Sequence, residues 1–139
     1  MSFWSALWAR PDELSPLARY TIANGLLYMA AGAVLYLAPM WLLELAFMTE
    51  LDPMAAGFVN LLGMAVGFIG WFYVMGGRTG TDSFALGTVV DRLLLPFVLV
   101  PIVLADVVPI TPLLAFGIGD PLLAIGALVL WKRGQSASP

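Results

Sequence analysis

The sequence predicts an all-α polytopic membrane protein, a four-transmembrane-helix bundle that forms a single domain over residues 1–139. Composition is the first reason: 61% of the residues are hydrophobic and 11% are charged, whereas soluble domains contain about 45–50% apolar and about 25% charged residues. The second reason is length. Segments 20–43 and 53–77 hold no charge, and each exceeds the ~20 residues that cross a bilayer's hydrocarbon. Segments 84–106 and 112–131 are also long enough to span.

The predicted helix starts follow one local pattern. Ser15-Pro16, Asp52-Pro53 and Thr111-Pro112 each place a capping side chain before a proline at the first helical position. Asp82-Ser83 takes the same part for the third helix, without a proline. These positions predict where the four helices begin.

The two ends of the chain are predicted to lie outside the spans. Residues 1–10 lack the basic region and long apolar core of a signal peptide. One helical face of this segment instead gathers four large apolar side chains, Phe3, Trp4, Leu7 and Trp8. We therefore expect residues 1–15 to be an interfacial segment anchored by two tryptophans. Residues 134–139 are expected to be a short disordered tail.

Basic residues outside the spans predict the orientation. If the N-terminus is inside, all of them lie inside, and the outer loops contain acids but no base. The positive-inside rule then predicts N-in and C-in. We expect a multi-pass protein of a bacterial inner membrane. The residues concerned are Arg10, Arg19, Arg78, Lys132 and Arg133.

Several classes of chemistry are excluded by composition. The chain contains neither cysteine nor histidine, which removes disulfides, thiol redox chemistry, zinc sites and histidine-ligated haem. We expect no metal and no cofactor. The net charge is −3, and without a basic patch nucleic acid is not an expected partner.

Three charges inside the predicted third and fourth spans, Asp91, Arg92 and Asp120, are the main candidate site residues. A charge at the bilayer centre costs at least ~2.5–3.5 kcal/mol on insertion scales, so such residues are usually functional. Arg92 is the only base in the predicted spans. We expect it to pair with Asp120 across the hairpin of the last two helices, with Asp91 facing Asn24 or Asn60.

The halves of the chain align weakly, which indicates a parallel two-hairpin repeat. Thr21-Ile-Ala-Asn24 resembles Thr88-Val-Val-Asp91, and Asn60 precedes Trp71 by the same spacing as Asp120 precedes Trp131. Each span would then contribute one amide or carboxylate at a similar depth. Either this layer locks the helices in register or it forms a site.

Three functions compete for this layer. The first is binding or transport of a small apolar or lipid-like molecule, with contacts from Asn24, Asn60, Asp91, Arg92, Asp120 and Tyr28. The second is an accessory or structural subunit of a membrane complex of the respiratory type. The third is a membrane-embedded acid–base enzyme that uses Asp91, Arg92 and Asp120, with Tyr28 or Tyr73 as donors. Enzyme chemistry is disfavoured because no nucleophile motif or metal cluster accompanies these residues.

The expected partners follow from the same features. The spans require a lipid bilayer, and the first function adds a lipid-like ligand. Gly63 and Gly67 form a small-xxx-small pair, which permits close helix contact within the chain or in a homo-oligomer. A membrane-complex partner belongs to the second function.

The whole chain resembles small four-helix bacterial membrane proteins of the DoxX-like families. The resemblance rests on length, the four-span layout and the elements Val90-Asp91-Arg92-Leu93 and Gly119-Asp120-Pro121-Leu122. It implies a four-helix membrane bundle, and in some members a link to quinol oxidase complexes. It transfers no catalytic residue to this chain.

Overall fold

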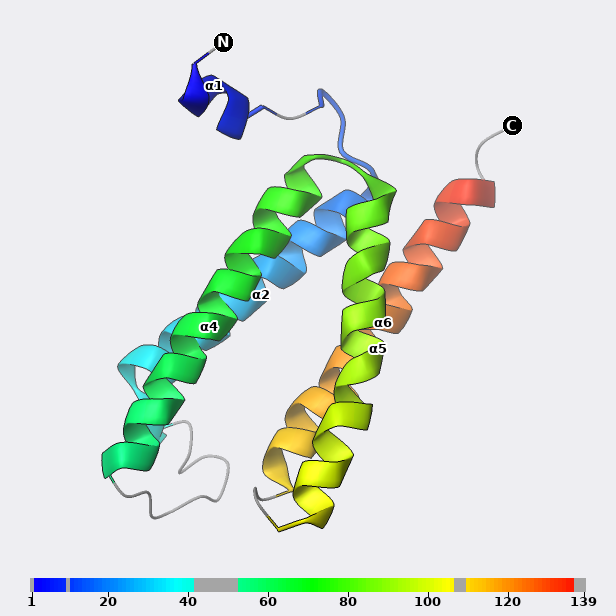
Figure 1. The fold of residues 1–139 in the computed structure, drawn as a ribbon. Coiled ribbons are helices and arrows are strands. Elements are labelled where there is room, and N and C mark those ends of the chain that lie inside the picture. The colour runs from blue at the N-terminus through cyan, green and yellow to red at the C-terminus, as the bar shows by residue number, and fades with distance from the viewer. Residues whose placement is uncertain (1, 10, 42–52, 107–109, 137–139) are drawn as a thin grey trace. The chain divides into compact units, whose positions relative to one another are not determined.

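The structure, a computed structural model, describes residues 2–9, 11–41, 53–106 and 110–136. Its elements are all helices: α1 (Phe3–Leu7), α2 (Pro16–Leu37), α4 (Pro53–Arg78), α5 (Asp82–Leu104) and α6 (Thr111–Ser136) (Figure 1). The predicted all-α class is confirmed. The four long helices begin within one or two residues of the predicted starts.

Three helices are long and apolar enough to cross a membrane: α2, α4 from Met54 onward, and α5. This confirms a multi-pass membrane protein. The helix α6 has 26 residues, which at about 1.5 Å per residue exceeds the ~30 Å of bilayer hydrocarbon. It is not among the three candidate spans. Several side chains in its first turns lie outside the residues that the structure describes. The fourth span therefore stays a prediction.

The predicted cap of α2 is confirmed. The helix begins at Pro16, and the Ser15 hydroxyl oxygen accepts a hydrogen bond from the Ala18 N–H at 3.1 Å. This bond satisfies one of the N–H groups that the first turn leaves without a helical partner. Asp52, the predicted cap of α4, lies outside the described residues.

The predicted cap of α5 is wrong by one residue. Thr81 is the N-cap, its side chain makes no capping hydrogen bond, and Asp82 is already helical. The Thr81 hydroxyl instead shares a hydrogen bond of 2.9 Å with the Thr79 hydroxyl, so it is engaged within the loop. Asp82 still stabilises the helix start, because an acid in the first turn complements the helix dipole.

The chain divides into two compact units, which we describe separately. Unit 1 contains residues 1–21 and 76–139, and unit 2 contains residues 22–75. Unit 1 therefore holds α1, the first turns of α2, the end of α4, and the α5–α6 hairpin. Unit 2 holds the rest of α2 and α4.

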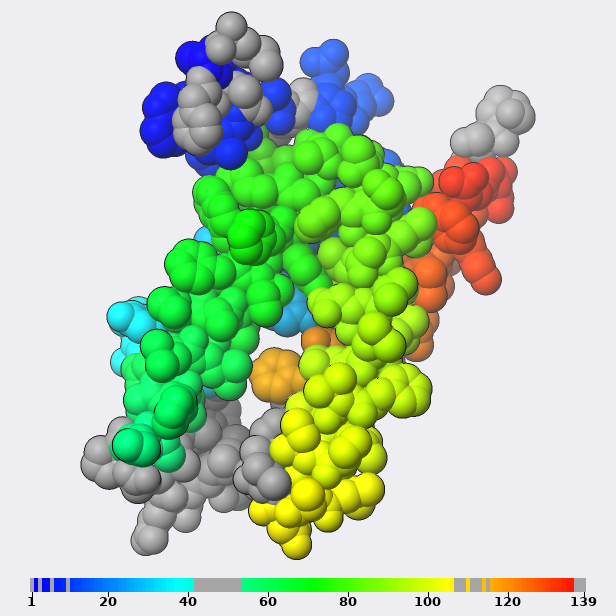
Figure 2. Space-filling model, in the orientation of Figure 1, coloured from blue at the N-terminus to red at the C-terminus, as the bar shows by residue number. Residues whose placement is uncertain are grey.

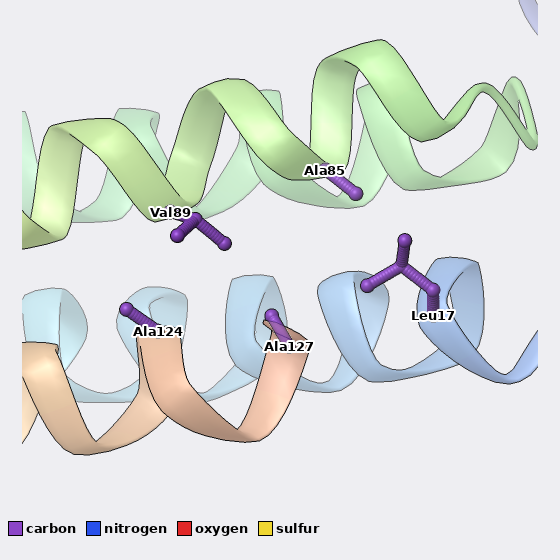
Figure 3. Close-up of a cluster of buried hydrophobic side chains, with 5 residues drawn as sticks. All are labelled: Leu17, Ala85, Val89, Ala124 and Ala127. Carbon is purple, nitrogen blue, oxygen red and sulfur yellow. The ribbon is translucent and has the colours of Figure 1, made fainter. Parts of the chain in front are cut away.

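The α5–α6 hairpin of unit 1 packs through small side chains. In Figure 3, Ala85 and Val89 of α5 face the side of α6 that carries Ala124 and Ala127. Leu17, from the start of α2, completes this cluster. Alanine and valine let the two backbones approach closely, which is the usual basis of helix packing in membranes.

Within unit 1, Arg78 at the end of α4 contacts the N-terminal segment. Nη2 of Arg78 donates a hydrogen bond of 2.8 Å to the Trp8 carbonyl, and the guanidinium carbon lies 4.7 Å from the centroid of the Trp8 ring. Trp4 and Trp8 are both exposed. That this segment lies in a membrane interface stays a prediction.

At the other end of unit 1, α6 extends further than the expected boundary. Helix continues through Ser136, so the first residues of the expected 134–139 tail are helical. The Ser136 hydroxyl donates to the Lys132 carbonyl at 3.1 Å. This bond links the last helical residue to the turn before it.

Glycines bring α2 and α4 into direct backbone contact in unit 2. A Cβ built on Gly25 would lie 2.7 Å from the Gly70 carbonyl oxygen, and one on Gly63 would lie 2.5 Å from the Tyr36 nitrogen. A Cβ on Gly32 would meet the backbone of Gly67. Of the two roles left open for Gly63 and Gly67, these contacts support packing within the chain.

Most large apolar side chains of the spans point outward. On α5 they include Val90, Leu94, Phe97 and Leu104, and its surface is drawn in yellow-green to yellow in Figure 2. Exposed apolar area of this extent needs a bilayer or a partner to cover it. An apolar outer surface of this kind is expected of a helix that spans a membrane.

Candidate functional site

Arg92 is the largest fully buried side chain among the described residues, with 1% of its surface exposed. It lies near the middle of α5, about 15 Å along the axis from Asp82 at about 1.5 Å per residue. The buried residues of α5 form one face, Ala85, Thr88, Val89 and Arg92. Arg92 therefore extends the face that packs against α6.

Asp120 takes the corresponding place on α6. It is 8% exposed, and Asp120, Ala124 and Ala127 follow the spacing of one helical face. Ala124 and Ala127 pack in one cluster with Ala85 and Val89 of α5. Continued by one turn, the antiparallel packing of these faces brings Arg92 and Asp120 to a similar level. That the two side chains pair stays a prediction.

The backbone beside Arg92 carries a second polar group. Pro96 lies four residues further along α5, and a proline has no N–H to donate to the carbonyl of the preceding turn. The Arg92 carbonyl therefore lacks its normal helical donor. Thr88, one turn earlier, is satisfied locally because its hydroxyl donates to the Ala85 carbonyl at 2.8 Å.

Asp91 is separated from this buried face. Its side chain is exposed while that of Arg92 is buried, because adjacent helical residues point about 100° apart. Asn24 and Asn60 belong to unit 2, so the expectation that Asp91 faces one of them stays a prediction. Of the three charges in the predicted spans, only Arg92 and Asp120 lie on the packed faces of unit 1.

The candidate residues Asn24, Tyr28 and Asn60 belong to unit 2. Asn24 is 5% exposed, and among the described residues its buried Nδ2 has no hydrogen-bond partner. One turn further along α2, the Tyr28 ring packs edge-on against Tyr73 of α4, with centroids 5.5 Å apart. Tyr73 is buried. That these residues share one layer with Arg92 and Asp120 stays a prediction.

Asn60 has a structural role that the sequence did not indicate. Its Nδ2 donates a hydrogen bond of 2.6 Å to the Tyr36 carbonyl. This bond joins α4 to the last turns of α2. Asn24 and Asn60 look equivalent in the sequence, but in unit 2 only Asn60 uses its amide to join the two helices.

Sequence reasoning missed an apolar groove of about 440 Å³ in unit 2. Its floor is the glycine contact between α2 and α4, and its walls carry large apolar side chains. The lining positions recur three and four residues apart on each helix. This spacing is a sequence signal that could have predicted a shared face. The principal wall residues are Met29, Tyr36, Met64, Phe68 and Trp71.

The described residues offer no group of three His, Cys, Asp or Glu side chains that could hold a metal ion. The candidate residues of unit 1 offer a guanidinium and a carboxylate, and those of unit 2 offer amides and two phenols. These groups bind by hydrogen bonds and charge.

No family model matches the chain, and no curated protein or solved structure matches it either. The resemblance to DoxX-like families thus gains no support from a family match. What the structure supports is the general layout, a small helical protein with three candidate membrane spans.

Proposed function

We propose that this chain is a four-span, N-in and C-in protein of a bacterial inner membrane that binds or transports a small apolar or lipid-like molecule. Arg92 and Asp120 are its polar anchor. The proposal is supported above all by the burial of Arg92, whose side chain is 1% exposed. An arginine in the middle of a membrane span is costly, and such residues are usually retained for function.

The chemistry of a guanidinium favours a ligand with an oxygen-bearing head. Arginine carries five N–H donors in a rigid plane and stays charged. A single carboxylate accepts two of these in a bidentate pair. A guanidinium of this kind suits a phosphate, carboxylate or carbonyl oxygen on the ligand, while the ligand's apolar part lies in hydrocarbon.

The second candidate, an accessory or structural subunit of a membrane complex, is favoured by a different observation. In the most apolar window of each candidate span, at most 28% of the residues are buried within the chain. The outward-facing apolar surface of these helices contacts either lipid or another subunit. In that case the Arg92–Asp120 pair only holds α5 and α6 in register.

A double apolar replacement separates these two functions. Removing one partner of a buried ion pair leaves an uncompensated charge, whereas replacing both by apolar residues of similar size is often neutral or stabilising. Arg92→Met with Asp120→Leu should therefore fold. We expect native mass spectrometry to detect a co-purifying lipid-like molecule on the original protein and to lose it in this double variant.

The control is a double variant at outward positions of the same helices, Val90→Met with Ile118→Leu. It should keep the bound molecule. If the folded Arg92→Met, Asp120→Leu protein retains the same adduct as the original, the pair is a scaffold and the anchor role is wrong.

A further inference from the structure

The amide of Asn24 stands out within unit 2. It lies about 12 Å along α2 from Pro16 at about 1.5 Å per residue, inside a candidate membrane span. Only 5% of the Asn24 surface is exposed, and its Nδ2 has no hydrogen-bond partner among the described residues. An amide carries two donors on this nitrogen.

Leaving such a donor unsatisfied is costly. In hydrocarbon no water replaces the missing partner, so an unpaired polar group costs several kcal/mol. A leucine, which has the same branched shape, would avoid this cost. The other asparagine of unit 2 does not have the problem, because Asn60 donates to the Tyr36 carbonyl at 2.6 Å. A partner from outside the chain would account for Asn24.

The surroundings of Asn24 within unit 2 are aromatic. Tyr28 lies one turn further along the same face of α2, and its ring packs against that of Tyr73. The backbone contact between Gly25 and Gly70 fixes the level of the two helices. Tyr73, one turn beyond Gly70 on the antiparallel α4, therefore lies near the level of Asn24.

We infer that Asn24 is the hydrogen-bond donor of a binding site for a neutral, apolar molecule that carries a carbonyl or ether oxygen. The Tyr28–Tyr73 ring pair provides the apolar wall beside it. The ligand is neutral because the described residues of unit 2 contain no charged side chain. This inference rests on the proposed function and names the chemical class of the ligand that Asn24 recognises.

Stability of the protein in detergent is the first test, with Asn60 as the matched control. Asn24→Leu removes an unsatisfied donor, so its Tm should stay equal or rise by a few degrees. Asn60→Leu breaks an existing bond and leaves the Tyr36 carbonyl without it, so its Tm should fall. If Asn24→Leu lowers the Tm as much as Asn60→Leu does, Asn24 has a structural partner and the inference is overturned.

Benzophenone provides the second test, because it is a neutral apolar ketone that forms a covalent bond on illumination. We expect it to label the cyanogen bromide fragment that ends at Met29. Asn24→Leu should reduce this labelling by about tenfold, the effect of about 1.4 kcal/mol from one lost hydrogen bond. Labelling of the original protein that Asn24→Leu leaves unchanged overturns the inference.

The outcomes also distinguish this inference from the proposed function. Unchanged labelling in Asn24→Leu, together with loss of the lipid adduct in Arg92→Met, Asp120→Leu, overturns only the role of Asn24. A retained adduct in the folded Arg92–Asp120 double variant, with labelling that still depends on Asn24, removes only the Arg92 anchor and supports the ketone site.

Discussion

The hydroxyl of Tyr20 donates a hydrogen bond to the main-chain carbonyl of Leu123 at 3.1 Å, although 103 positions separate the two residues. The bond ties the first turns of α2 to α6 within unit 1. Gly126 makes room for it, because a Cβ on this glycine would collide with the Tyr20 hydroxyl. The start of α2 therefore packs on α6 because the Tyr20 phenol occupies the space that a side chain at Gly126 would fill.

This fit predicts a specific coupling between two substitutions. Gly126→Ala should destabilise the protein by about 1–3 kcal/mol through overpacking, and Tyr20→Phe by about 0.5–1.5 kcal/mol through the lost bond. In the double variant the clashing oxygen is gone. Its loss of stability should therefore be smaller than the sum of the losses in the two single variants. Thermal unfolding in detergent measures all three.

Strict additivity in that cycle would contradict the contact. Gly119→Ala is the control, since a Cβ at Gly119 meets nothing within 4 Å. Its effect on stability should be small and independent of Tyr20.

The glycines of unit 2 give a second prediction. Gly32→Ala and Gly70→Ala should each destabilise the protein by at least about 1–3 kcal/mol, because the added methyl meets the backbone of the facing helix. Backbone atoms cannot move aside as a side-chain tip can. Gly57→Ala should be neutral, since its Cβ direction is open. The measurement is the Tm of each variant. A Gly57→Ala loss equal to that of Gly70→Ala would contradict backbone contact as the cause, because alanine is a better helix former than glycine.

The helices were predictable from sequence because each depends on local signals. Uncharged length indicated α2 and α4, and Ser15-Pro16 indicated the start of α2, where the cap bond was confirmed. The shift from Asp82 to Thr81 at α5 was not predictable, because the Thr81 hydroxyl is engaged by Thr79 through the loop geometry. Boundaries of this kind depend on a few hydrogen bonds rather than on composition.

The candidate site was predictable only as a set of residue types. A charge or amide inside a span identifies Asn24, Asn60, Asp91, Arg92 and Asp120 equally well. Their different environments depend on helix rotation, which buries Arg92 and exposes Asp91, and on packing, which gives Asn60 the Tyr36 carbonyl as an acceptor. The groove of unit 2 depends on backbone contact at Gly32 and Gly63, and spacing alone does not fix which glycines meet.

The predicted orientation can be tested with single cysteines, because the chain contains none. Ser5→Cys, Thr79→Cys and Ser136→Cys lie at exposed positions that N-in and C-in topology with four spans places on the inner side. Ile110→Cys lies in the loop between α5 and α6 and should face outward. In intact cells a membrane-impermeant maleimide should label only Ile110→Cys. Labelling of Ser136→Cys but not Thr79→Cys would show that α6 does not cross with α5.

The last prediction concerns the Arg92–Asp120 pair itself. Each single reversal, Arg92→Asp or Asp120→Arg, places two like charges at one level of the α5–α6 hairpin, and breaking a buried pair in this way typically costs about 3–5 kcal/mol. The double reversal restores opposite charges at the same level, so its Tm should exceed that of both single variants. Asp91→Arg with Arg92→Asp is the control, because the exposed side chain of Asp91 lies off the face that packs on α6. Recovery in the control equal to that in the Arg92–Asp120 swap would place the partner of Arg92 elsewhere than on α6.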